Sequence, residues 1–257
     1  MLARAISRPG GGARLTPGHL LVLFLAAGLA WAWTVDQSQG MGSMGGTMGR
    51  GFVSFVVMWG LMMTAMMIPS AAPFASLHAR TLSTRRVPRL LLFAAGYMTV
   101  WVASGIPAFA LAMGIDEVVA SEATVGTVAA VIIFSASGLY QLTSWKYRCL
   151  SHCRSPIGQV LHYASYRGLA RDFRVGLHHG GYCLACCWSL MILMAAFGFM
   201  NLWAMVGLAA IVAIEKYWIR GESFARATGV AALVLAVAVI WVPELAPGLD
   251  GSGMMGG

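Results

Sequence analysis

Seven long apolar runs, separated by short polar segments, constrain this chain more than any other feature of its sequence. A helix of about 20 apolar residues crosses the hydrocarbon core of a bilayer. The runs are continuous, unlike the alternating pattern of an outer-membrane barrel strand. We therefore predict an all-α, polytopic membrane helix bundle with about seven transmembrane helices. The predicted spans are 19–34, 52–77, 90–114, 125–145, 182–200, 202–218 and 228–242.

The charged residues support the same interpretation. They make up only 10% of the chain, against about 25% in an ordinary soluble domain. The net charge of +8 would suit nucleic acid, but the Lys and Arg residues fall in alternate segments, with Arg50 as the exception. This is the positive-inside pattern, which predicts an inside amino terminus and an outside carboxyl terminus. We expect a multi-pass protein of the bacterial inner (cytoplasmic) membrane, surrounded by the lipid bilayer, with no nucleic-acid partner.

The first apolar run has two interpretations. It is short, it follows three arginines, and 30–32 has the small-residue spacing of a signal-peptide cleavage site. If this run is removed, six spans remain. The predicted segments are a basic cytoplasmic tail (1–18), the first helix or signal (19–34), an outer Gly/Met-rich loop (35–51), a helical membrane domain (52–243) with a cytoplasmic basic loop (146–180), and an outer Gly/Met tail (244–257).

All the cysteines of the chain fall in two tight clusters. Residues three and four apart share one face of a helix, so each cluster would direct its thiols one way. The predicted topology puts both clusters at the cytoplasmic ends of consecutive spans, which are usually neighbours, with the second cluster in the first turn of its helix. We predict that they converge on a soft-metal or redox site, although cysteine is also simply a small residue that buries easily. The candidate ligands are Cys149, Cys153, Cys183, Cys186 and Cys187, with His178 and His179.

The 17 methionines are also clustered. Thioethers are neutral soft ligands that hold Cu(I) without losing a proton. Some of these methionines punctuate the outer Gly-rich loop, and others recur every four residues along the second span. We predict outer or transmembrane copper contacts, with core packing as the alternative for the membrane methionines. The candidates are Met41, Met44 and Met48 in the loop, and Met58, Met62, Met63, Met66 and Met67 in the span.

Glu215 is the one acidic residue near the interior of a predicted span. A charged residue within the membrane is a functional candidate by default. Lys216 and Arg220 follow it in the sequence and offer partners at the inner surface. We therefore favour an ion pair at the interface over a catalytic or transport role for this carboxylate.

Several motifs resemble those of a bacterial family labelled as predicted metal-binding integral membrane proteins, a domain of unknown function. The resemblance covers roughly 52–220 and implies metal binding, with a proposed copper-chaperone role that supplies cuproenzymes such as tyrosinase-type oxidases. Carried over by position, the five cysteines would be the ligands. The pair at 144–145 departs from the Pro-Leu of the family pattern. The motifs are Met63-Thr-Ala-Met-Met-Ile-Pro69, Tyr140-Gln-Leu-Thr-Ser-Trp-Lys-Tyr-Arg-Cys-Leu-Ser-His-Cys-Arg-Ser-Pro156, Gly181-Tyr-Cys-Leu-Ala-Cys-Cys-Trp-Ser-Leu-Met191, and Met200-Asn-Leu-Trp203 with Glu215-Lys216.

We expect a membrane metal-binding protein, not an enzyme, that binds Cu(I) and hands it over or transports it. Its expected partners are the metal ion and a cuproenzyme or a soluble copper carrier. Zn(II) is the alternative metal because thiolates also bind it. Two other functions stay open: a membrane thiol–disulfide oxidoreductase that uses Cys183 and Cys186, and a metal-free structural or assembly subunit.

Overall fold

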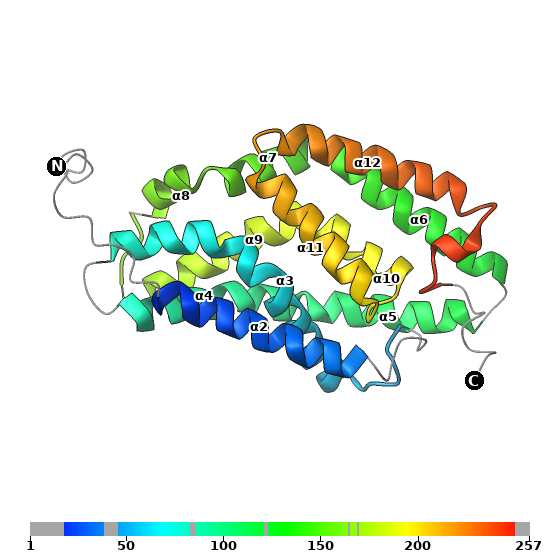
Figure 1. Ribbon diagram of the computed structural model, residues 1–257, viewed down its shortest axis with the longest axis horizontal. Helices are drawn as coiled ribbons and strands as arrows, with labels where there is room; N and C mark the ends of the chain where they lie inside the picture. Colours follow the sequence, from blue (N-terminus) through cyan, green and yellow to red (C-terminus); the bar gives the residue numbers. More distant parts are fainter. Residues whose placement is uncertain are drawn as a thin grey trace.

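The computed structural model describes residues 18–38, 46–82, 86–120, 123–163, 165–168 and 170–249, which form helices and their connections. The helices make an elongated bundle in which most lie along the long axis and α11 crosses obliquely (Figure 1). They are α2 (Gly18–Ser38), α3 (Phe52–Thr81), α4 (Arg86–Ala103), α5 (Gly105–Val119), α6 (Ala123–Gln141), α7 (Ser144–Arg154), α8 (Pro156–Tyr163), α9 (Arg171–Met191), α10 (Leu193–Phe197), α11 (Leu202–Tyr217) and α12 (Gly221–Ala238), followed by one 3-10 turn (Pro243–Leu245).

Six helical stretches are long and apolar enough to cross a membrane, which confirms the predicted all-α membrane bundle. Helices α4 and α5 form one such stretch, and so do α9 and α10. The predicted sixth span corresponds to α11, which has only 16 residues. The count of seven spans, their orientation and the removal of the first helix stay predictions. The six stretches are Leu21–Ser38, Phe52–Thr81, Val87–Val119, Thr124–Gln141, Arg171–Phe197 and Gly221–Ala238.

Helices α3 and α9 are the most deeply buried of the six stretches. Helix α9 packs closely on α4 because glycines, which have no side chain, occupy the point where the two helices cross. A Cβ atom on Gly176 would lie 2.1 Å from the carbonyl oxygen of Phe93, and one on Gly96 would lie 2.1 Å from that of Phe173. This close approach of two backbones requires glycine on both helices. It also brings Tyr97 of α4 against the cysteine-bearing part of α9.

Two helix boundaries differ from the sequence-based prediction. The predicted fourth span runs to residue 145, but α6 ends at Gln141 and α7 starts at Ser144. The Thr143 hydroxyl accepts a hydrogen bond from the backbone N–H of Lys146 at 3.3 Å and so caps the new helix. Helix α9 starts at Arg171 instead of near 182. The predicted basic loop at 146–180 therefore contains α7, α8 and the first half of α9.

Candidate metal site

Helix α7 carries the first pair of cysteines, Cys149 and Cys153, at positions four residues apart. The helix ends at Arg154, and Pro156 disfavours helical geometry in Ser155, the residue between them. Both thiols are half-buried and pack against the main core. Burial raises the pKa of the Cys149 thiol, and the nearby Lys146 ammonium opposes that shift in part.

Helix α9 carries the other cysteines in its middle, so the predicted position in the first helical turn is wrong. An earlier start at Arg171 places three helical turns before Cys183, and the positive end of the helix dipole is too far away to act on its sulfur. Cys183, Cys186 and Cys187 are each 1% exposed. They lie on one face, as their spacing predicts, and Cys187 is close enough to Cys183 and Cys186 to act on them electrostatically.

The two cysteine helices are neighbours, and the thiols of Cys153 and Cys186 lie close enough to act on each other electrostatically. Cys153 thus joins the three thiols of α9 in one connected group, which we call the thiol cluster. Helices α7 and α9 lie side by side, as expected for neighbouring segments, and the assignment of these thiols as one set of ligands stays a prediction. Cys149 lies one turn away on α7, where Lys146 is the charged group that acts on it.

A small cavity of about 180 Å³ opens beside the thiol cluster. Residues of α3, α7, α9 and α11 line it, and it exposes a thiol, an imidazole, an ammonium and a guanidinium to one space. The cavity is large enough for a metal ion or a few waters. Its lining residues are Ser70, Pro73, Phe74, Cys153, Arg154, His179, Lys216 and Tyr217.

His179 is oriented as a metal-binding imidazole commonly is. Its Nδ1 lies 2.8 Å from Oε1 of Gln159, an amide oxygen that only accepts hydrogen bonds. Nδ1 therefore carries the proton, and the lone pair is on Nε2. The ring stacks on Phe74 with the centroids 4.4 Å apart, and it lines the small cavity. Of the two predicted histidine ligands, this one lies beside the thiols.

His178 has different surroundings. Its Nδ1 lies 2.9 Å from the Tyr163 hydroxyl, and its ring packs against those of His162 and Tyr182, with centroids 5.3 and 5.0 Å away. His152 stacks on Tyr182 at 3.8 Å and lies 6.3 Å from the His178 ring. This aromatic cluster joins α7, α8 and α9.

Two buried lysines lie next to the thiol cluster, and the sequence-based prediction missed the role of both. The Lys216 ammonium lies 2.9 Å from the sulfur of Cys183 and 3.0 Å from the Ser70 hydroxyl. The Tyr97 hydroxyl lies 3.0 Å from the same sulfur. Lys146 donates to the carbonyl oxygen of Cys186 at 2.7 Å. The positions of both lysines near helix ends gave only a weak signal of such contacts.

Glu215 pairs with a different residue from the ones expected. Its carboxylate lies 2.6 Å from the Lys146 ammonium, and it accepts a hydrogen bond of 2.8 Å from the Gln141 side chain. The predicted pairing with Lys216 or Arg220 at the interface is wrong, because Glu215 is 1% exposed and faces α6 and α7. The adjacent residue, Lys216, points to the thiols instead.

The membrane methionines of the prediction lie in the core. Met48, Met58, Met62, Met63, Met66 and Met67 are all buried and belong to the same contiguous group of side chains as the three α9 thiols. Met41 and Met44 lie outside the described residues. Within the described residues, no set of three or more His, Cys, Asp or Glu side chains is already arranged to hold a metal ion. At Cys183, the sulfur contacts an ammonium and a hydroxyl group.

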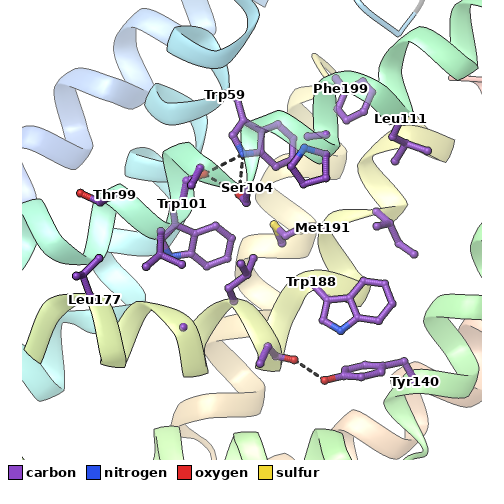
Figure 2. Close-up of a pocket in the computed structure, with 18 residues that line it drawn as sticks. Trp59, Thr99, Trp101, Ser104, Leu111, Tyr140, Leu177, Trp188, Met191 and Phe199 are labelled. Carbon is purple, nitrogen blue, oxygen red and sulfur yellow. Dashed lines mark hydrogen bonds between the residues drawn. The ribbon is translucent and has the colours of Figure 1, made fainter. Parts of the chain in front are cut away.

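A second cavity, of about 810 Å³, lies between α3, α4, α5, α6 and α9 (Figure 2). Trp59 donates from its indole nitrogen to Ser104 and to the carbonyl oxygen of Trp101 at one wall, and Trp188 lies across the space. Its lining, among the residues that are described, contains no charged side chain. This cavity is therefore suited to an apolar ligand and not to an ion.

The thiol cluster, the imidazole beside it and the membrane-length helices can be compared with known proteins. The family model PpoB2, described as a copper chaperone, matches residues 56–239. The chain belongs to the PpoB2 copper chaperone family. The matched region starts within α3 and ends just after α12, so it includes the thiol cluster and the small cavity. Membership of this copper chaperone family gives the chain a copper-related role. No curated protein and no solved structure matches it.

Proposed function

We propose that this chain binds Cu(I) through the thiol cluster and hands the metal to a copper-requiring protein. The observation that carries the proposal is that Cys153 of α7 lines the small cavity next to the helix that carries Cys186 and the other thiols. Thiolates from two helices can approach one ion there, and soft sulfur ligands favour Cu(I). His179 supplies a nitrogen donor at the same cavity. Zn(II) is the competing metal, because the same donors bind it.

The surroundings of the cluster also suit transfer. Cys153 and His179 line a cavity, whereas Cys183, Cys186 and Cys187 are buried behind them. A metal ion held between these layers has an accessible side from which a recipient ligand can take it. We propose a cuproenzyme or a soluble copper carrier as the recipient. We also propose the bacterial inner membrane as the location, with the thiol cluster toward the cytoplasm.

The copper content of the purified full-length protein tests this proposal. Cys153→Ser and Cys186→Ser should each remove most of the copper that the wild type binds under reducing conditions. Cys149→Ser is the matched control, because this thiol lies on the same helix but one turn from the contact between α7 and α9. Copper and zinc are measured together by elemental analysis after loading with equal amounts of each. Equal copper in all three variants and the wild type would rule out the thiol cluster as the binding site.

The orientation is tested separately. A reporter fused to the carboxyl terminus, which is predicted to lie outside, should be active only if it functions in the periplasm. Cysteine labelling in intact cells and in lysed cells gives an independent result, since Cys153 should react only after lysis. If Cys153 reacts in intact cells, the proposed side of the membrane is wrong, although the copper site itself could remain.

A further inference from the structure

Ten buried methionines belong to one contiguous group of core side chains, and the three thiols of α9 belong to the same group. Five of these methionines lie on α3, and Met48 precedes that helix. The other four come from the end of α9, from α10, from the following turn and from α11. Only the six at Met48 and on α3 follow from the spacing in the sequence. The additional four are Met191, Met194, Met200 and Met205.

On α3 the thioethers form two rows with the same spacing. Met58, Met62 and Met66 follow one another at four-residue intervals, and Met63 and Met67 form the second row. Side chains at this spacing lie about 5–6 Å apart at Cβ. All five side chains are at most 4% exposed. The rows therefore run along the interior of the bundle.

Two methionines of the second group, Met191 and Met200, lie near aromatic side chains of the first half of α3. Phe199, next to Met200, packs edge-on against Phe55 and Trp59 of α3, with centroids 6.0 and 6.1 Å apart. Figure 2 shows the sulfur of Met191 at the wall of the large cavity, between Trp59 and Trp188. Thioethers from α9 to α11 thus supplement the α3 rows.

One end of this methionine group is held by a strained turn. Met48 has φ of 55°, an uncommon value for a residue other than glycine, yet its side chain is only 6% exposed. The turn is fixed by Asp116 of α5, which accepts a hydrogen bond of 3.1 Å from the backbone N–H of Thr47 and another from its hydroxyl. Strain of this kind persists only where the surroundings impose it, and it is common at functional sites.

The other end reaches the thiol cluster. The Tyr97 hydroxyl lies 3.2 Å from the carbonyl oxygen of Met67 and 3.0 Å from the sulfur of Cys183. The Ser70 hydroxyl lies 3.9 Å from the sulfur of Met67 and 3.0 Å from Lys216, which itself contacts Cys183. Met67 and Cys183 therefore share one polar neighbour, Tyr97, and Ser70 and Lys216 together link the Met67 thioether to the Cys183 sulfur.

We infer that the ten buried methionines form a thioether path along which Cu(I) moves between Met48 and Cys183. The inference rests on the proposed copper-binding function and adds the route by which the metal reaches the thiols. Neutral thioethers hold Cu(I) without a proton being released. A series of similar, weak sites permits movement, because the ion leaves each site as readily as it enters it. Near Cys183 the ion exchanges neutral sulfur for thiolate, which holds it more firmly.

Methionine-to-leucine variants test the path, because this exchange keeps the volume and the packing of the core. The full chain is placed in vesicles with the Met48 end outward, Cu(I) is added outside, and an impermeant Cu(I) chelator is enclosed. Met62→Leu/Met66→Leu should slow copper arrival on the order of tenfold, equivalent to about 1.4 kcal/mol. Met113→Leu is the control, because Met113 is 50% exposed on α5 and lies outside the methionine group.

The copper content of the same preparations in detergent separates this inference from the proposed function. There the small cavity is directly accessible, so the Met62→Leu/Met66→Leu protein should load its thiols fully. Slow copper arrival in the vesicles with full copper content in detergent supports the path. An unchanged arrival rate with full copper content overturns the path and leaves the thiol site unaffected. If the copper content falls in Cys153→Ser but not in the methionine variant, the loss concerns the thiol site and not the path. If the double variant folds poorly, Met66→Leu should still slow arrival several-fold, and an unchanged rate there overturns the path equally.

Discussion

The ammonium of Lys216 lies 2.9 Å from the sulfur of Cys183, inside a bundle of apolar helices. Both residues are buried, and Lys216 also lines the small cavity. A hydrogen bond to a charged group contributes about 1.5–3 kcal/mol. The ammonium group therefore favours the thiolate form of this cysteine, which is the form that binds a metal.

We expect Lys216→Gln to weaken Cu(I) binding by on the order of tenfold, because the thiolate loses its charged partner. Competition with a Cu(I) chelator at fixed pH measures the change. Arg220→Gln removes the same charge four residues further along the chain, from an exposed position, and should leave the affinity unchanged. Equal affinities for the wild type and Lys216→Gln would show that the ammonium does not assist binding.

The Lys146–Glu215 pair predicts a strong non-additive effect on stability. The two side chains are 0% and 2% exposed, so Lys146→Met leaves a buried carboxylate without its cation and should cost about 3–5 kcal/mol of unfolding free energy. Lys146→Met/Glu215→Leu removes both charges and should recover most of that loss. Chemical unfolding in detergent, followed by tryptophan fluorescence, provides the measurement. Additive losses would mean that the pair does not act as a unit.

The glycine crossing of α4 and α9 predicts a position-specific effect. Gly176→Ala places a Cβ atom 2.1 Å from a backbone oxygen of α4, and such overpacking costs about 1–3 kcal/mol. The two helices must separate, which moves Tyr97 away from Cys183. Gly181→Ala is the control on the same helix, because no atom lies within 4 Å of its added Cβ. We expect it to be neutral or slightly stabilising. Thermal unfolding of both variants distinguishes them.

The stability should also depend on pH through His152. Burial lowers its pKa below 6.5, and the neighbouring His178 and His162 act in the same direction. The unfolded state thus binds a proton more readily than the folded state, so this contribution to stability is present above pH 6.5 and is lost as the pH falls through the lower folded pKa. The midpoint of thermal unfolding should drop between pH 7.5 and pH 5. His152→Phe, which retains a ring to stack on Tyr182, should reduce the drop. An unchanged drop would assign it to other groups.

Local periodicity predicted the helical membrane bundle, and the tendency of consecutive segments to be neighbours predicted that the two cysteine-bearing helices lie together. Apolar runs specify helices, and spacings of three and four residues place Cys183, Cys186 and Cys187 on one face. The buried methionine rows of α3 follow from the same rule. The match to the copper chaperone family agrees with the metal assignment at the level of copper.

The failures involve contacts between residues that are distant in the sequence. The sequence predicts that Glu215 pairs with the cations nearest to it, but its partner in the structure is Lys146, 69 residues away. The start of α9 was missed because its first turns are polar and include Arg171 and Asp172, which the hydropathy of a span does not mark. Asp172 is buried, and its carboxylate forms an ion pair with Arg89, whose Nε lies 2.6 Å away. Periodicity does not reveal such pairings.

The position of Lys216 also affects which charge of metal ion can be bound inside the membrane domain. A Cu(I) ion between two thiolates carries one net negative charge, and the buried ammonium beside Cys183 balances it, whereas the Arg154 guanidinium is half-buried and donates to the carbonyl oxygens of Glu215 and Ile219. Lys146 and Glu215 already balance each other. A divalent ion on the same two sulfurs would leave an excess positive charge in a medium of low polarity, which is costly. Electroneutrality would therefore discriminate between a monovalent and a divalent cargo unless a third sulfur lost its proton.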